Sequence, residues 1–175
     1  TLDYLVVREK KCSRQSCTLR VIGPRQGKRV DETIIRQGNK IYYESNEAQH
    51  SLLYIESLNP YTTFTNEELN ERDKLISQCL KQAQKSRLDT WCSEKQWRLL
   101  TRFSPKPDSV NQLSHLYDTE LAGTINLFPK KGIGYNTSVA GRHAGEHFFE
   151  KDAFVGFWGE GIKASSRIQS TLNGS

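Results

Sequence analysis

The start of the chain contains four short runs of apolar and β-branched residues, separated by residues that favour turns. The runs are LDYLVV (2–7), CTLRVIG (17–23), RVDETII (29–35) and KIYY (40–43). Glycine and proline in the intervening GPRQGK and RQGNK supply backbone angles that other residues resist. This pattern predicts a small, mostly antiparallel sheet or a set of hairpins.

A helical pattern replaces the strand pattern after NPYTTF. Thr65 is followed three residues later by Glu68, which is the spacing of a capping box. Apolar or small residues then recur on one face, namely Leu69, Leu75, Ile76, Cys79, Leu80 and Ala83. We expect a helix from about Asn66 to Lys85.

A second helix is expected in the run TWCSEKQWRLL (90–100). Asp89 precedes this run and is the expected cap, because aspartate favours the position before a helix. Trp91 or Trp97 would then face the core together with Leu99 and Leu100.

Prolines in FSPKPDS interrupt the helical pattern, because proline does not fit inside a helix. A short third helix is expected in DSVNQLSHLY (108–117), with Asp108 or Ser109 as its cap.

The last third of the chain returns to strand-like runs. AGTINLFP (122–129) and DAFVGFWG (152–159) have the composition of buried strands. A glycine-rich segment of about 20 residues separates them, and a connection of that length is usually functional or disordered. The expected fold class is α+β, with small antiparallel strands, a helical middle and two core-type strands.

The chain of 175 residues can bury a core of its own, and it carries a net charge of +5. Acidic residues in NEELNERDK and EHFFEKD are interleaved with the basic ones, and no known nucleic-acid-binding module is visible. A solvated basic face is therefore favoured over nucleic-acid binding. No run approaches the ~18 consecutive apolar residues of a membrane span, so no span is expected.

The cysteines are Cys12, Cys17, Cys79 and Cys92, and they form no C-x-x-C pair or metal-ligand cluster. Cys12 and Cys17 flank SRQS, a plausible hairpin tip, so a disulfide between them is left open. Cys79 occupies an apolar helical position, as a buried thiol would. Four free cysteines are the favoured interpretation.

The stretch GRHAGEHF fits the H-x-x-E-H pattern of inverted zinc peptidases, with His143, Glu146 and His147. That site needs both histidines on one face of a continuous helix, because one helical turn brings them to one ion. Gly141 and Gly145 each cost such a helix about 1 kcal/mol. We therefore expect a loop that presents His143 alone.

The run LAGTINLFPKKGIGYNTSVAGRHAGEHFFEKDAFVGFWGEGIK (121–163) resembles the C-terminal part of the alkaline phosphatase superfamily. That family includes phosphatases, phosphodiesterases and sulfatases. Its members have a strand, an irregular loop, a G-x-H-G type motif that binds a metal ion, and a second strand in this order. The corresponding pieces are GTINLFPKKGIGY, GRHAGE and DAFVGFWGEGIK, and the resemblance covers about residues 100–165.

This resemblance implies that residues 100–175 are the C-terminal part of an α/β catalytic domain and that residues 1–99 are a cap-like insertion. It implies two-metal hydrolysis of a small anionic phosphate or sulfate ester. His143 would bind one divalent ion, with zinc as the expected metal. Glu146 and His147 would lie behind this ligand or, as the favoured interpretation, be solvated groups of the loop.

The family's nucleophile and most of its metal ligands have no counterpart in the sequence. The chain alone is therefore expected neither to be catalytic nor to bind zinc tightly. It also lacks methionine, which favours a part of a longer protein and leaves the compartment open. The alternative is a standalone α+β binding or interaction module without catalysis. Substrate and oligomeric state are not determined by the sequence.

Overall fold

The computed structural model describes residues 2–47, 50–80, 82–84, 87–119, 121–135, 145–151 and 159–161. Its strands form one antiparallel sheet in the order β5-β6-β4-β3-β2-β1-β7. The strands are β1 (Leu2–Arg8), β2 (Ser16–Arg25), β3 (Lys28–Gln37), β4 (Lys40–Ser45), β5 (Gln82–Gln84), β6 (Arg87–Ser93) and β7 (Ile125–Pro129). The helices are α1 (Asn66–Cys79), α2 (Glu94–Thr101), α3 (Ser109–His115) and α4 (Phe148–Lys151).

Strands β1 to β4 are the four runs expected from the sequence, and each pairs with the next along the chain. A two-residue turn joins β2 to β3, with φ of 48° at Gln26 and 76° at Gly27. Positive φ at both positions matches the twist of the flanking strands and suits glycine. The expected antiparallel sheet is confirmed.

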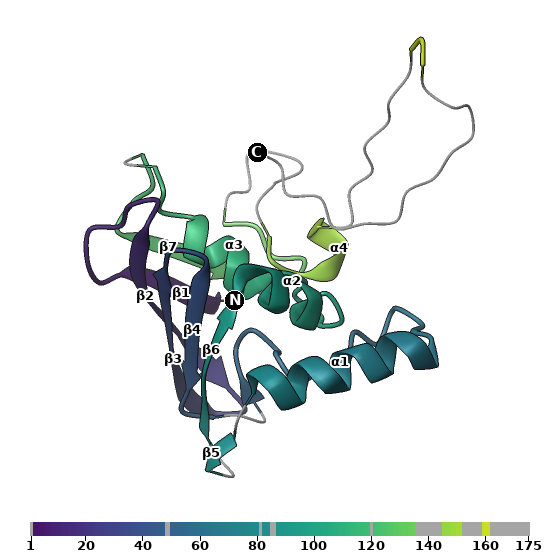
Figure 1. Ribbon diagram of the computed structural model, residues 1–175. Coiled ribbons are helices and arrows are strands. Elements are labelled where there is room, and N and C mark those ends of the chain that lie inside the picture. Colours follow the sequence, from purple (N-terminus) through teal and green to yellow (C-terminus); the bar gives the residue numbers. More distant parts are fainter. Residues whose placement is uncertain are drawn as a thin grey trace.

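The helices lie on one side of the sheet, and no described helix lies on the other (Figure 1). Alternate residues of β1 to β4, such as Tyr4 and Val6 in β1 or Val30 and Ile34 in β3, are buried beneath the helices. The helices and the loop between β4 and α1 complete this core with Leu52, Leu53, Ile55, Leu75, Trp97, Leu100, Val110, Leu113 and Tyr117. We call the opposite side of the sheet the uncovered face.

Helix α1 begins as expected and ends earlier than expected. Thr65 and Glu68 form the capping box, with hydrogen bonds in both directions. The helix ends at Cys79 rather than Lys85, because residues 82–84 pair with β6 as the short strand β5. Local periodicity could not reveal this end, since a tertiary pairing sets it.

The expected start of the second helix at Asp89 is wrong. Residues 87–93 form β6, which extends the sheet beside β4. Helix α2 starts at Glu94, and Ser93 and Gln96 form its capping box. Residues 87–93 thus pair with the edge of β4, and the helix begins only after this strand.

Of the two tryptophans considered for the core, Trp97 is the buried one. Its Nε1 donates to the carbonyl of Ile41 at 2.8 Å, which ties α2 to β4. Trp91 is 45% exposed and lies on β6.

Helix α3 occupies Ser109–His115, within the expected range of 108–117. Asp108 holds the N-cap position, with φ of 57°, but its side chain makes no capping hydrogen bond. The preceding segment SPKP interrupts the helices as expected and forms a largely buried connection.

The first run expected as a buried strand, AGTINLFP, is instead an edge strand. Its β7 pairs with β1 at the end of the sheet, and Ile125 and Leu127 are 59% and 55% exposed. Phe128 alternates with them toward the core and stacks on Tyr4, with ring centroids 4.8 Å apart. Residues 152–158 of the second run lie outside the described residues.

The expectation of four free cysteines is wrong, because all four are paired. Cys12 pairs with Cys17 across the connection between β1 and β2. Cys79 pairs with Cys92 and joins the end of α1 to β6.

The chain is therefore a mixed α+β protein. Strand β7 belongs to the expected C-terminal part and pairs with β1 of the expected insertion. The division at residue 99 and the origin in an alkaline-phosphatase-like domain stay predictions. None of the described helices combines the length and the apolar character that crossing a membrane requires.

Candidate functional site

The expected metal ligand His143 lies among residues 136–144, outside the described residues. Within the parts of the chain that are described, no three His, Cys, Asp or Glu side chains are grouped as metal ligands. The metal expectation for His143 stays a prediction.

Glu146, expected as a solvated loop residue, is largely buried instead. Its carboxylate accepts a hydrogen bond from Lys151 Nζ at 2.6 Å, and only 12% of the side chain is exposed. Burial raises the pKa of Glu146, and Lys151 opposes that shift. Lys151 also donates to the carbonyl of Pro107 at 2.8 Å, so this pair fastens α4 to the connection before α3.

His147 directly precedes α4 and lies in a small aromatic cluster. Its ring stacks on Phe149 at 5.6 Å between centroids, and Tyr61 packs against Phe149 at 4.7 Å. Lys131 Nζ lies 4.0 Å from the Phe149 ring centroid and 4.9 Å from that of Tyr61. Burial, followed by the charge of Lys131, lowers the pKa of His147. The cluster orders α4 and leaves His147 outside any helix.

A second group of polar side chains is buried between the sheet and the loops, around Lys106. Lys106 Nζ donates to Asp3 Oδ2 at 2.5 Å and to the carbonyl of Leu52 at 2.8 Å. It also lies 4.2 Å from the ring centroid of Tyr4. Burial lowers the pKa of Lys106, and Asp3 opposes that shift.

Glu32 projects from β3 into the same interior. It accepts hydrogen bonds from the Leu52 amide at 2.5 Å and from Ser45 Oγ at 3.3 Å. Burial raises the pKa of Glu32 to about 7, although these hydrogen bonds, Tyr43 and the charge of Lys106 act in the opposite direction. Glu32 is 1% exposed and Lys106 is 2% exposed, whereas the side chain of Asp3 is 20% exposed. Glu32 and Lys106 are therefore closed to solvent, and their contacts hold the loops against the sheet.

Among the described histidines, His115 has two carboxylate partners. Its Nε2 lies 2.9 Å from Glu94 and its Nδ1 lies 2.7 Å from Asp118. Asp118 also pairs with Arg36, whose fully buried guanidinium donates to carbonyls of the β1–β2 connection and of α3. This chain of contacts joins α2, α3 and β3 and is accounted for by packing.

The uncovered face carries apolar residues that contact one another across strands. Across β7, β1 and β2, Leu127 lies opposite Leu5, and Leu5 lies opposite Ile22. Two residues along the strands, Ile125 lies opposite Val7. We call Leu5, Val7, Ile22, Ile125 and Leu127 the edge patch. Strand β7 is at the end of the sheet opposite β5.

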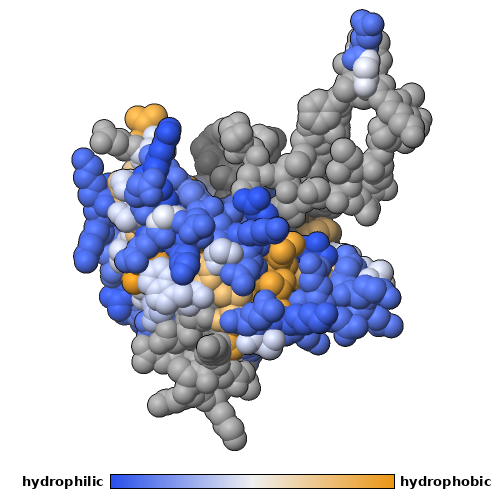
Figure 2. Space-filling model, in the orientation of Figure 1, coloured by the Kyte–Doolittle hydropathy of each residue, from blue (hydrophilic) through white to orange (hydrophobic). Residues whose placement is uncertain are grey.

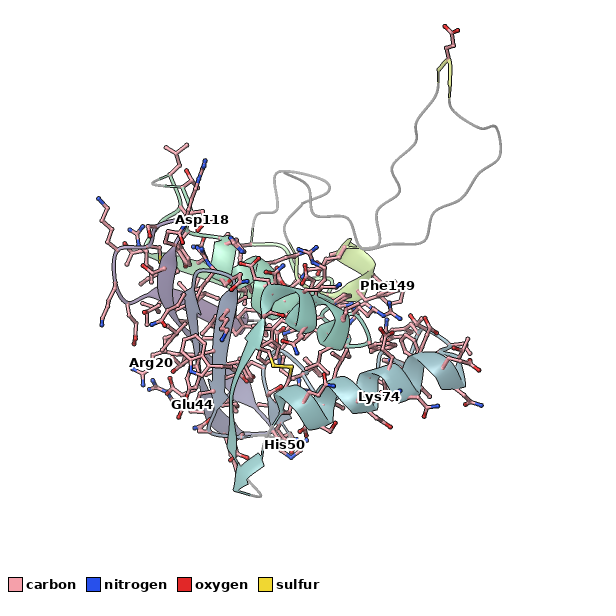
Figure 3. The ribbon with its side chains drawn as sticks, in the orientation of Figure 1. Arg20, Glu44, His50, Lys74, Asp118 and Phe149 are labelled. Carbon is pink, nitrogen blue, oxygen red and sulfur yellow. A yellow bond between two sulfur atoms is a disulfide. The ribbon has the colours of Figure 1, made fainter. Side chains whose placement is uncertain are left out.

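Charged residues occupy the middle of the uncovered face. Arg20 pairs with Asp31 at 2.9 Å and with Glu9 at 3.7 Å. Figure 3 shows Arg20 and Glu44 on this side of the sheet, and Phe149 on the helical side beside α4. The edge patch is therefore bounded by charge toward the centre of the sheet.

Exposed apolar residues continue into the loops that flank β7. Leu121 is 95% exposed, and Ile133 and Tyr135 are 40% and 52% exposed. Figure 2 shows an orange protrusion at the top left, over the loop before β7, above a largely blue surface. Among the described residues, much of the exposed apolar surface thus lies at β7 and its two flanking loops.

Cations lie at both ends of β7. Before the strand, Thr124 lines an open depression together with Arg8, Lys10 and Lys11. Glu9 also lines it, and its carboxylate pairs with Arg20 at 3.7 Å. After the strand, the exposed Lys130 follows directly. Lys131 comes next, and its Nζ contacts Phe149 and Tyr61 on the helical side.

Comparisons with known proteins identify no relative. No family model matches the chain, and no curated protein or solved structure matches it significantly.

The sequence carries a sign of the buried polar groups. In RVDETIIR, Glu32 and Arg36 fall in phase with the inward-facing Val30 and Ile34, so their burial follows from strand alternation. The exposure of Ile125 and Leu127 has no comparable sign, because it depends on β7 lying at the end of the sheet.

Proposed function

We propose that this chain is a binding module that recognises a protein partner through the edge patch on the uncovered face. The observation that carries the proposal is the exposure of Ile125 and Leu127, at 59% and 55%, next to Leu5, Val7 and Ile22. Contiguous exposed apolar surface that is bordered by charge is typical of protein interaction sites.

The buried polar groups support a catalytic function less well than the edge patch supports binding. Glu32 and Lys106 are closed to solvent, and the contacts of His115 are explained by packing. The hydrolase hypothesis depends on His143 and has its own test, which is loss of bound metal in a longer protein that carries His143→Ala.

Selection from a displayed library of natural protein fragments tests the proposal. Bound fragments should shift the backbone amide resonances of Leu5, Val7 and Ile22 in the purified chain. Ile125→Ser should weaken their binding about ten-fold, because it removes an exposed apolar side chain from the contact. Lys74→Glu, on α1 and away from the sheet, is the matched control and should leave binding unchanged (Figure 3).

Thermal unfolding should show that both variants fold. The proposal is wrong if the bound fragments leave the edge patch resonances in place, or if they respond to Lys74→Glu and not to Ile125→Ser.

A further inference from the structure

The outer edge of β7 has unpaired backbone groups in the part of the sheet that the structure describes. Among the described strands, β7 is the last of the sheet and pairs with β1 alone. The amide of Arg8 donates to the carbonyl of Thr124 at 2.9 Å, which makes these residues a hydrogen-bonded pair. Hydrogen-bonded and non-bonded pairs alternate along antiparallel strands. The amide and carbonyl groups of Ile125 and Leu127 therefore point away from β1.

The two ends of this edge limit what can pair with it. Pro129 has no amide to donate, and Lys130 and Lys131 follow it. Proteins commonly use proline and lysine to prevent edge strands from pairing with one another. Between these ends, the edge offers the amides of Ile125 and Leu127, with their side chains in the edge patch.

The charges disfavour a second copy of the chain as the occupant. Antiparallel pairing of β7 with a second β7 would bring the exposed Lys130 of one copy to the start of the other strand. That end is lined by Arg8, Lys10 and Lys11, so like charges would meet at both ends.

The same charges complement an acidic segment. We propose that an extended segment of a partner protein adds to the outer edge of β7 as a further strand of the sheet. Its short apolar centre packs on Ile125 and Leu127, and its acidic residues on either side face the cations at the two ends of β7. This inference rests on the proposed function and names the partner's conformation and charge.

Strand addition obtains its affinity from backbone hydrogen bonds and its specificity from alternate side chains. Alternate side chains of the added segment would lie beside Ile125 and Leu127 on the uncovered face. The centre of that face, where Arg20 forms salt bridges, lies beyond the edge patch. The added segment would therefore contact only the edge patch.

A synthetic peptide of alternating valine and threonine, with two glutamates at each end, is the probe. Two N-methylated versions carry methyl groups on the two alternating sets of amides. Because alternate amides of a strand point to opposite edges, one version should lose at least about ten-fold in affinity and the other should bind normally. Equal effects of the two methylation patterns would overturn strand addition.

Substitutions at Leu127 test the same contact from the side of the protein. Leu127→Pro removes an outward amide, whereas the matched control Leu127→Thr keeps it and shortens the side chain similarly. The proline variant should bind the peptide about five-fold more weakly than the threonine variant. If the proline variant does not fold, the methylated peptides still decide the question.

Charge is tested with a peptide in which lysines replace the glutamates. It should bind at least about five-fold more weakly than the acidic peptide, and equal binding would contradict an acidic partner. Concentration-dependent dimers that Leu127→Pro abolishes would instead identify a second copy as the occupant.

The outcomes separate this inference from the proposed function. If the two methylated peptides bind with equal affinity while bound fragments still shift the resonances of Leu5 and Ile22, strand addition is wrong and the proposed binding module stands. If no fragment or peptide acts on the edge patch, both are wrong.

Discussion

Glu32 is a carboxyl group that the fold keeps away from water. Its pKa of about 7 lies above the ordinary value of 4.5, and burial is the main cause. Between those two pH values the folded chain holds a proton that the unfolded chain has released. The free energy of unfolding therefore falls as the pH rises from about 4.5 to about 7, by roughly 3 kcal/mol, and it is level above that range.

Glu32→Gln should remove this dependence, because glutamine resembles the protonated carboxyl group. Urea unfolding at pH 5 and pH 8 measures the effect. The variant should be more stable than the parent at pH 8 by up to roughly 3 kcal/mol and similar to it at pH 5. Glu67→Gln, on an exposed side of α1, should behave as the parent does. If the free energy of unfolding changed with pH in the same way for the parent and Glu32→Gln, Glu32 would not be the group responsible.

The boundaries between elements separate what the sequence predicts from what it does not. The capping box at Thr65 is local, and the sequence predicts the start of α1 from it. An equivalent capping box at Ser93 and Gln96 marks the start of α2, and its spacing is a local signal of the same kind. The end of α1 and the strand β6 were not predictable locally, because pairing with β4 and the Cys79–Cys92 disulfide determine them.

The candidate site follows the same division. Strand alternation predicts which residues of β1 and β2 face away from the core. Which of them remain exposed depends on the partner strand and on the layer that covers them. The sequence pattern could therefore not distinguish β7 as an edge strand from a buried one.

The Cys79–Cys92 disulfide should stabilise the fold by restricting the unfolded chain. It closes a loop with a sequence separation of 13, for which the loss of unfolded-state entropy corresponds to roughly 3 kcal/mol. The double variant Cys79→Ala with Cys92→Ala should lower the free energy of unfolding by about 2–4 kcal/mol in urea. Removing Cys12 and Cys17, with a separation of 5, should cost less. The reverse order would contradict this account.

At the scale of the whole molecule, the net charge is +5, and the cations at the two ends of β7 act on the binding of charged peptides. Binding of the acidic peptide should weaken as sodium chloride increases, because salt screens the attraction. Binding of the lysine-ended peptide should strengthen over the same range, because salt screens its repulsion from the same cations. Calorimetry across a salt series measures the two trends, and parallel trends would contradict the role of the cations.

The pairing of β7 with β1 also affects how the chain is made. Strands β1 to β4 can pair as soon as each is synthesised, since each contacts its neighbour along the chain. The outer edge of β1 must wait for β7, which emerges from the ribosome roughly 120 residues later. A nascent chain therefore passes through a stage in which β1 is the open end of the sheet, available to chaperones or to neighbouring chains. In the nascent chain β7 thus covers the open edge of β1, and in the folded protein β7 itself is the strand proposed to bind a partner.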